Sequence, residues 1–215
     1  MLPLPGPASP SAPSISRTRR RLGLSVVVAG LLGALAACAP TPPAAPAVPA
    51  SSEVVVKPIT FPVSGGARYA DSFGAPRSGG RSHEGQDLPG AKGTPLVAAV
   101  SGVVIRVRHD VSGLSGNSLT IKGDDGWTYV YIHLNNDTPG TDDGVNAFEY
   151  AFAPGLAVNT RVAAGQFVGY MGDSGNAEDA GSHLHFEIHK PDGTVVNAHP
   201  SLQAATAAPT IPRSW

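Results

Sequence analysis

The chain has 215 residues, carries a formal net charge of −1, and contains 26 Gly and 21 Pro but only 14% charged residues. This length allows one globular domain with additional segments, or at most two small domains. The Gly and Pro content excludes a long coiled coil, and the near-neutral charge argues against a nucleic-acid-binding protein that works through a basic surface.

Residues 1–37 are predicted to be a signal peptide. A cluster of arginines at 17–21 precedes an apolar run at 22–35, which is too short for a membrane-spanning helix and is typical of a signal-peptide hydrophobic region. The run ends in Leu35-Ala36-Ala37-Cys38, which resembles the lipobox of bacterial lipoproteins and implies lipidation of Cys38. Ordinary secretion stays open as an alternative, because Ala34-Leu35-Ala36 also fits a small-x-small cleavage pattern.

Residues 38–58 are predicted to be a disordered tether, because the Pro- and Ala-rich stretch after Cys38 cannot bury enough apolar surface to fold. The leader and tether together predict an extracytoplasmic protein of the bacterial cell envelope, held to the membrane by a lipid anchor at Cys38. Cys38 is the only cysteine, so the body must be stabilised by its core or by a metal. Loss of the leader arginines leaves an acidic chain, which again predicts no nucleic-acid partner.

The body is predicted at 59–202, followed by a C-terminal tail at 203–215, and it consists of short β-strands. Strands are expected at 96–107, with a break at Ser101-Gly102, and at 166–171. The runs 117–122 and 127–133 predict one hairpin, and the runs 183–189 and 194–197 predict another. No segment offers three turns of amphipathic helix. The fold class is therefore all-β, with mainly antiparallel sheets.

Strand alternation is expected to place histidines on a polar face. In the 183–189 strand, Leu184, Phe186 and Ile188 share one face, and His183, His185, Glu187 and His189 share the other. In the 127–133 strand, Thr128, Val130 and Ile132 are expected to face the core, with Tyr129, Tyr131 and His133 opposite. Burying several imidazoles without hydrogen-bond partners costs free energy, so we expect these strands to form the bottom of a polar groove.

Three short motifs carry the candidate chemistry: His83-Glu-Gly-Gln-Asp87, Tyr129-Val-Tyr-Ile-His133 and His183-Leu-His185. His83 and Asp87 would be ~13 Å apart in an extended strand, but Gly85 between them permits a bend. His183 and His185 are neighbours on one strand face, ~6.6 Å apart at Cα, so both imidazoles can point to one centre.

In order and spacing, these motifs and the glycines around them resemble the lysostaphin-type, LytM-like zinc metallopeptidases that cleave the peptides of bacterial peptidoglycan. The resemblance runs from about Phe73 to Leu202. Its other elements are Phe73-Gly74, Lys92-Gly-Thr-Pro95, Ala99-x-x-Gly102, Gly116-Asn117, Tyr131-x-His133-Leu134, Gly165-Gln166-x-x-Gly169, Gly172-x-Ser174-Gly175 and His183-Leu-His-Phe-Glu187. It implies a LytM-like fold of the duplicated hybrid motif type, with a groove formed by antiparallel sheets.

The resemblance also implies the site. His83, Asp87 and His185 would hold one Zn²⁺ ion, a donor set that suits this metal and leaves a fourth position open. His133 and His183 would be the catalytic residues: one accepts the proton of the attacking water, and one stabilises the oxyanion. The sequence does not show which role belongs to His133 and which to His183. The implied function is a membrane-tethered zinc metalloendopeptidase whose partner is peptidoglycan, acting on its stem or cross-bridge peptides.

Other residues have more ordinary expectations. His109, His189 and His199 are expected to be surface or structural residues, while Glu187 can orient a ligand imidazole or play a structural role. Arg77 stands where some family members have a Tyr, and Arg77 and Arg81 flank the groove and can meet substrate carboxylates. The long acidic connection at 135–152 can either wall one end of the groove or be a surface elaboration.

Two other functions stay open. The chain can be a non-catalytic peptidoglycan-binding module or an amidase activator, although such relatives have eroded motifs and this set is intact. It can also be a zinc D-Ala carboxypeptidase or an L,D-type peptidase, which the His-x-His pattern disfavours. The sequence does not identify the peptide bond that is cut.

Overall fold

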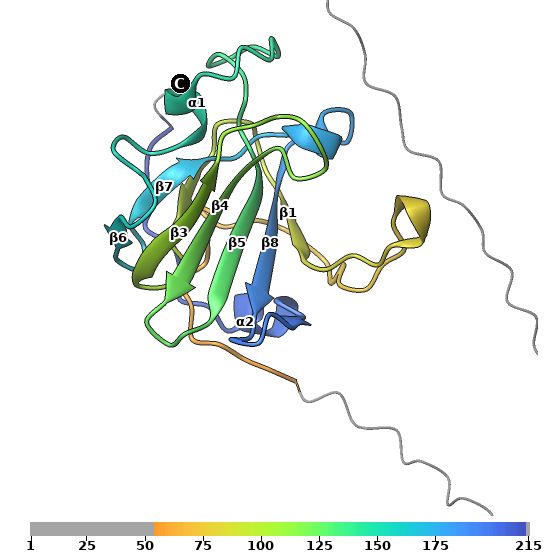
Figure 1. Cartoon of the computed structure of the whole chain (residues 1–215), viewed down its shortest axis with the longest axis vertical. Helices are drawn as coiled ribbons and strands as arrows, with labels where there is room; N and C mark the ends of the chain where they lie inside the picture. The colour runs from red at the N-terminus through yellow and green to blue at the C-terminus, as the bar shows by residue number, and fades with distance from the viewer. Residues whose placement is uncertain (1–53, 214–215) are drawn as a thin grey trace, which may run out of the picture. The chain divides into compact units, whose positions relative to one another are not determined.

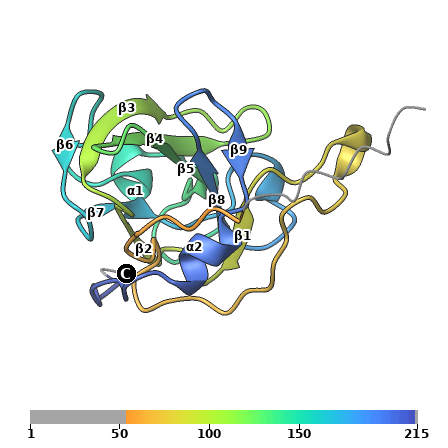
Figure 2. The ribbon, with the colours of Figure 1, turned by 90° about the horizontal axis from the view of Figure 1, so that it is seen from below.

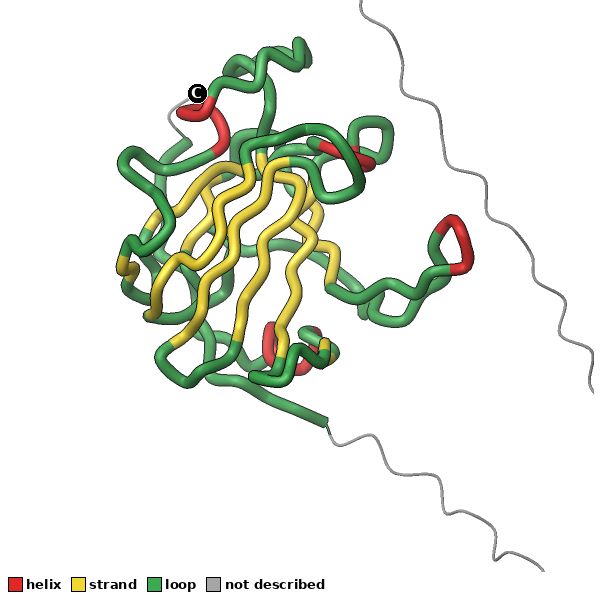
Figure 3. The backbone as a smooth tube through the Cα atoms, in the orientation of Figure 1, coloured by secondary structure: helices red, strands yellow, loops and turns green. Residues whose placement is uncertain are grey.

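The computed structural model describes residues 54–213, so the predicted signal peptide, Cys38 and most of the predicted tether lie outside the described part. Strands form most of its regular structure (Figures 1 and 3). Its helices are α1 (Phe148–Ala151), α2 (His199–Gln203) and two short 3-10 turns, η1 (Ser78–Gly80) and η2 (Gly175–Ala177). Within 54–213, no helix is long and apolar enough to cross a membrane.

A seven-stranded antiparallel sheet dominates the body. The order along it is β1 (Gln86–Pro89), β8 (His183–His189), β5 (Thr128–Leu134), β4 (Asn117–Gly123), β3 (Gly102–Arg108) and β6 (Arg161–Val162). The seventh strand, β9 (Val195–Val196), pairs with the far end of β8. β2 (Pro95–Val97) and β7 (Phe167–Tyr170) form a separate two-stranded sheet. Figure 2 shows the large sheet and the smaller one as separate layers of the body.

The two predicted hairpins are confirmed. β4 and β5 pair from Ser118↔Ile132 to Lys122↔Thr128, and Gly126, with φ 80°, lies in the turn between them. β8 and β9 are joined by a turn that ends at Gly193, which has φ 87°. Glycine is favoured at such positive φ values because it has no Cβ, which explains the Asp-Gly sequence of both turns.

The core lies on one face of the large sheet. Leu184, Phe186 and Ile188 of β8 are fully buried, as the strand alternation predicts. They pack in one cluster with Leu96 of β2 and Val168 of β7, so the small sheet closes the core. The opposite face of β8 carries its histidines and Glu187, which are only partly buried.

The predicted facing of β5 is wrong. Tyr129 and Tyr131 are fully buried in the core, and Ile132 is half-buried on the other side. The Tyr131 hydroxyl donates to the Val97 carbonyl at 3.1 Å and accepts from the Ala99 amide at 2.6 Å, so the buried hydroxyl is satisfied. Aromatic bulk with partnered hydroxyls therefore takes the core side.

His133 nevertheless reaches the polar side, because β5 contains a bulge at this residue. Asn117 pairs with Leu134 and Ser118 pairs with Ile132, which leaves His133 as the extra residue on β5. Its φ of 65° lies in the left-handed region, which is uncommon for a residue other than Gly. A bulge turns a side chain to the other face of the strand. The regular alternation of β5 therefore stops at Ile132 and does not apply to His133.

The connection at 135–152 is folded onto the body. α1 in this segment contacts β7, Phe152 forms a bridge with Gly169, and Ala151 and Phe152 are fully buried. The Lys92 ammonium lies 2.7 Å from carboxylate oxygens of both Asp137 and Asp142, and 2.9 Å from that of Asp173. Asp137, Asp142 and Glu178 also lie close enough to be considered as metal ligands. The Lys92 ammonium already supplies positive charge beside Asp137 and Asp142.

Both ends of the described chain meet on the body. The Phe61 amide donates to the Thr206 carbonyl at 2.9 Å, and the Thr206 amide donates to the Ile59 carbonyl at 3.0 Å. Further upstream, the Lys57 ammonium forms an ion pair with Asp125 at 2.8 Å. The chain is therefore fixed to the body from Lys57 onward.

Candidate active site

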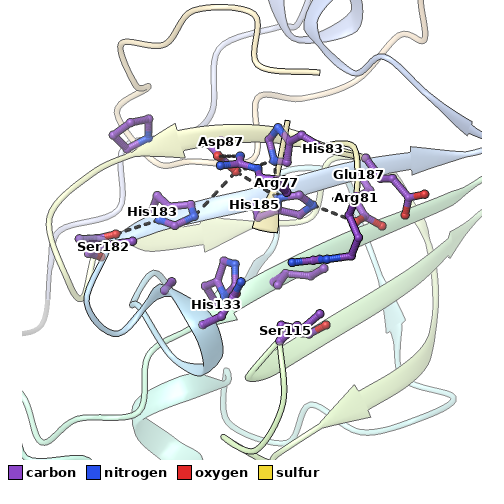
Figure 4. Close-up of a pocket in the computed structure, with 18 of the residues that line it drawn as sticks. Arg77, Arg81, His83, Asp87, Ser115, His133, Ser182, His183, His185 and Glu187 are labelled. Carbon is purple, nitrogen blue, oxygen red and sulfur yellow. Dashed lines mark hydrogen bonds and ion pairs between the residues drawn. The ribbon is translucent and has the colours of Figure 1, made fainter. Parts of the chain in front are cut away.

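The five histidine and aspartate side chains predicted to form the site line one pocket (Figure 4). The pocket has a volume of about 770 Å³ and lies on the polar side of the sheet. His83 precedes β1, Asp87 lies in β1, His183 and His185 lie in β8, and His133 lies at the β5 bulge. Segments that are far apart in the sequence thus meet because β1, β8 and β5 are adjacent strands.

The centre of the pocket is a tight group of three donor atoms. His83 Nε2 and His185 Nδ1 are 2.8 Å apart, and each lies 3.0 Å from Asp87 Oδ1. Pairing of Asp87 with His185 across β1 and β8 brings two of them together. This group could hold a metal ion.

His83 reaches Asp87 because the chain bends at Gly85, as expected. The structure adds a reason for Gly at this place. A Cβ on residue 85 would lie 2.5 Å from His185 Nε2 and 2.9 Å from the Phe186 carbonyl oxygen. Only a residue without a side chain lets the imidazole of His185 pack against this bend.

Each of the two imidazoles has its second ring nitrogen committed elsewhere. His83 Nδ1 lies 2.7 Å from the Ser72 carbonyl, and His185 Nε2 lies 2.8 Å from Glu187 Oε1. A carbonyl or carboxylate oxygen accepts a hydrogen bond from the N–H of these nitrogens, so the inward-facing nitrogens present lone pairs. Three electron pairs then converge within 3.0 Å. A cation between them removes the repulsion, so the donor set fits a metal such as Zn²⁺.

His133 and His183 lie beside this group and are oriented in the same way. His133 Nδ1 lies 2.8 Å from the Ser174 carbonyl, and His183 Nδ1 lies 2.8 Å from the Gly181 carbonyl. Their ring centroids are 4.9 Å apart, and His183 Nε2 lies 3.7 Å from Asp87 Oδ1. Both Nε2 atoms are therefore available as proton acceptors.

Burial and hydrogen bonding shift the pKa values of these groups. Burial lowers the pKa of His133 to about 4, so its imidazole is neutral at pH 7. Burial would raise the pKa of Asp87, but the imidazoles of His185 and His83 outweigh it and hold this pKa well below its usual range. Burial would also raise the pKa of Glu187, but its hydrogen bonds to His185 and His189 lower it to about 2.

The 135–152 connection, which could have walled one end of the groove, does not line the pocket.

The remaining histidines lie outside the group of His83, Asp87 and His185. His109 is exposed, and its Nε2 lies 2.7 Å from the Asn146 carbonyl. His189, expected to be solvated, is half-buried with Nε2 2.7 Å from Glu187 Oε2. His199 begins α2 and packs edge-on against Tyr69.

Three features of the site have no clear signal in the sequence. The Ser72 and Ser174 carbonyls orient His83 and His133, but a main-chain acceptor carries no residue signature. Gln86 is fully buried, and its Nε2 donates to the Ala70 carbonyl at 2.7 Å, which fixes the segment leading into Ser72. Arg77, which was expected to flank the groove and meet substrate carboxylates, lines the pocket and forms an ion pair through Nη2 with Asp87 Oδ2, the oxygen turned away from the histidines.

An antiparallel β-sheet with a His/Asp/His group in a polar pocket is the arrangement expected of a LytM-like peptidase domain. Residues 81–198 match peptidase family M23, and this segment is more than half of the chain. The chain belongs to peptidase family M23.

The chain is also similar to several solved structures. A putative glycyl-glycine endopeptidase LytM from Ruminococcus gnavus is 26% identical, with a TM-score of 0.52 over 71% of this chain and 63% of that one. The catalytic domain of lysostaphin from Staphylococcus simulans is 24% identical, with a TM-score of 0.49 over 64% and 92%. A zinc-containing peptidase from Vibrio cholerae is 23% identical, with a TM-score of 0.49 over 66% and 39%. The match thus spans less than two thirds of the Ruminococcus gnavus and Vibrio cholerae chains.

Proposed function

We propose that this protein is a zinc metalloendopeptidase that hydrolyses peptide bonds in peptidoglycan stem or cross-bridge peptides. The observation that carries the proposal is the convergence of His83 Nε2, His185 Nδ1 and Asp87 Oδ1 within 3.0 Å, with the outer nitrogen of each imidazole bound to an acceptor. His83, Asp87 and His185 would be the ligands of one Zn²⁺. When bound, this ion polarises a carbonyl and lowers the pKa of water.

His133 and His183 would be the catalytic residues. Each has Nδ1 bound to a main-chain carbonyl, which holds the ring and leaves Nε2 free to accept a proton from an attacking water. The imidazole that takes this proton can then donate it to the oxyanion or to the leaving amine. The two side chains are equivalent in this respect, so either order of the two roles is compatible with the geometry.

The proposal is tested by comparing zinc-loaded wild type with Asp87→Ala and with His109→Gln, a matched change of a histidine outside the pocket. We expect wild type and H109Q to bind zinc and to release new amine ends from purified sacculi, and D87A to do neither. Mass spectrometry of the released muropeptides identifies the bond. D87A protein that keeps both zinc and lytic activity contradicts the proposal. Wild type that binds sacculi but releases no amine ends with zinc present supports the non-catalytic module instead.

We also propose that the protein acts in the bacterial cell envelope, tethered to the membrane through a lipid on Cys38. The support is the lipobox-like Leu35-Ala36-Ala37-Cys38 at the end of the apolar run. Labelling with a radioactive fatty acid tests it: we expect label on wild type and none on Cys38→Ser. Equal labelling, or release of wild type into the medium as a free protein, contradicts lipidation.

A further inference from the structure

An arm formed by residues 74–83 projects from the body next to β1 (Figure 1). In this arm, the Arg77 amide donates to the Arg81 carbonyl at 2.9 Å, and Pro76 bridges to Ser82. The tip is η1. Arg77 and Arg81 are thus opposite one another across the arm, and both line the pocket.

The two arginines have different partners. Arg77 is bound to Asp87, so its charge is balanced inside the pocket. Arg81 donates from Nε to the Ser78 carbonyl at 3.2 Å and from Nη2 to Ser78 Oγ at 3.4 Å. Within residues 54–213, no carboxylate lies within ion-pair distance of Arg81.

The Arg81 guanidinium is also oriented for binding. Arg81 is exposed, and its bonds to Ser78 use few of its five N–H donors, so the others are available to a ligand. In Figure 4 the guanidinium is turned toward the imidazoles of the pocket. A planar guanidinium placed this way matches a carboxylate through two parallel hydrogen bonds.

Three acids line the pocket with Arg81: Glu84, Asp87 and Glu187. Among the described residues, Glu84 forms no ion pair with Arg81. Asp87 is bound by Arg77, His83 and His185, and Glu187 is bound by His185 and His189. None of the three is paired with Arg81 in the structure, so a carboxylate of the ligand can take this place. Arg81 lies in the same pocket as His83, Asp87 and His185, the proposed zinc ligands. A substrate anion bound to Arg81 would therefore lie close to the bond that is cut.

We propose that Arg81 is a specificity residue that binds a free carboxylate of the substrate, so that the enzyme prefers acidic peptides of the stem to neutral oligoglycine bridges. This inference rests on the proposed peptidase function and names its substrate class. Such a carboxylate can come from the backbone of an isoglutamate-type residue, from the side chain of a diamino acid, or from the peptide C-terminus. All three offer Arg81 the same chemistry.

The test uses an acidic stem peptide, analogues in which one carboxylate at a time is replaced by a carboxamide, and an oligoglycine peptide whose C-terminus is also a carboxamide. We expect kcat/KM to fall on the order of 10-fold for the one analogue that lacks the recognised carboxylate, and for oligoglycine, mainly through KM. That analogue identifies the source. Equal kcat/KM for all analogues overturns the inference.

Variants assign the effect to Arg81. In Arg81→Gln the ratio of kcat/KM between the acid and its carboxamide should fall to about 1, and Arg81→Lys should recover part of the ratio. Arg106→Gln, a change at an exposed arginine in β3 outside the pocket, should keep the wild-type ratio. R81Q protein that keeps the wild-type preference for the acid contradicts the assignment.

Binding of the same peptides, measured by calorimetry, separates this inference from the proposed activity. Absence of cleavage with a carboxylate preference that R81Q removes contradicts the peptidase function but supports the binding role of Arg81. Cleavage with no such preference supports the peptidase function and overturns the inference.

Discussion

At the scale of single residues, the site is organised by what lies behind each imidazole. His83, His133 and His183 each have a main-chain carbonyl at Nδ1, whereas His185 has the carboxylate of Glu187 at Nε2. A carboxylate behind a ligand imidazole increases its basicity and fixes its orientation. Glu187 is therefore the side chain whose removal should most directly affect metal binding without changing a ligand.

We predict that Glu187→Ala lowers Zn²⁺ affinity by about 10- to 100-fold, measured by competition with a chromogenic chelator. His189 contacts the other oxygen of Glu187 and not the metal group, so His189→Gln is the matched control and should change the affinity little. An E187A affinity within twofold of wild type contradicts the orienting role.

His133 predicts a pH dependence of stability. Its pKa is lowered by burial to about 4, below the value near 6.5 expected when unfolded. The unfolded chain therefore takes up a proton that the folded chain does not, and stability falls as the pH drops from about 6.5 to about 4. The loss from this group is at most about 3 kcal/mol.

We test this with His133→Asn, since Asn tolerates the positive φ of this position. Chemical denaturation of the metal-free protein in chelator should give a shallower loss of unfolding free energy between pH 6.5 and pH 4 in H133N than in wild type. Parallel pH curves for the two proteins would show that His133 does not titrate in this way.

At the scale of elements, the strands could be predicted from the sequence, but the bulge that brings His133 to the polar side could not. Both hairpins follow from alternation and Gly-containing turns, and the face of β8 follows from Leu184, Phe186 and Ile188. Tyr129 and Tyr131 face the core, and the extra residue at the bulge turns His133 to the opposite side. The ligand set came from the resemblance to a family, because side chains 98 or more positions apart meet only through the pairing of β1 with β8.

The bend before β1 depends on Gly85. We predict that Gly85→Ala weakens Zn²⁺ binding by at least about 10-fold while the fold is kept, because its Cβ would lie 2.5 Å from His185 Nε2. Far-UV circular dichroism checks the fold and chelator competition checks the affinity. Gly79→Ala, at the tip of the arm, is the control: its φ of 73° makes the backbone strained, but its Cβ meets no atom within 4 Å, so it should bind zinc as wild type does. Unchanged affinity in G85A contradicts the packing argument.

The 135–152 connection is joined to the body through Lys92. The side chains of Asp137 and Asp173 are only 1% and 7% exposed, so without Lys92 two buried carboxylates lose their counter-charge. We predict that Lys92→Met lowers the unfolding free energy by about 3 kcal/mol, whereas Lys122→Met, at an exposed lysine of β4, changes it by less than about 0.5 kcal/mol. Denaturant titration measures both.

A second change checks the cause of this effect. Adding Asp173→Asn to K92M removes one of the carboxylates that Lys92 neutralised, so part of the stability should return. K92M protein as stable as wild type, or no recovery in the double variant, contradicts this account of how the connection is held.

At the scale of the whole domain, the large sheet separates two functions. One face buries the apolar side chains with the β2–β7 pair, and the other presents the histidines and, from the arm, two arginines. An ion held by His83, Asp87 and His185 would connect the segment before β1 to the neighbouring strand β8. Binding of an ion there should stabilise the fold as well as supply chemistry.

We predict that Zn²⁺ at about 100 times its dissociation constant adds about 2.7 kcal/mol to the unfolding free energy. For a domain of this size each kcal/mol corresponds to about 2–4 °C, so Tm should rise by about 5–10 °C in a thermal melt. His109→Gln should show the same rise, and His185→Ala should show almost none, because it lacks one of the three converging donors. An equal rise in H185A would mean that zinc stabilises the protein from another place, and Asp137, Asp142 and Glu178 would then be the next ligands to replace.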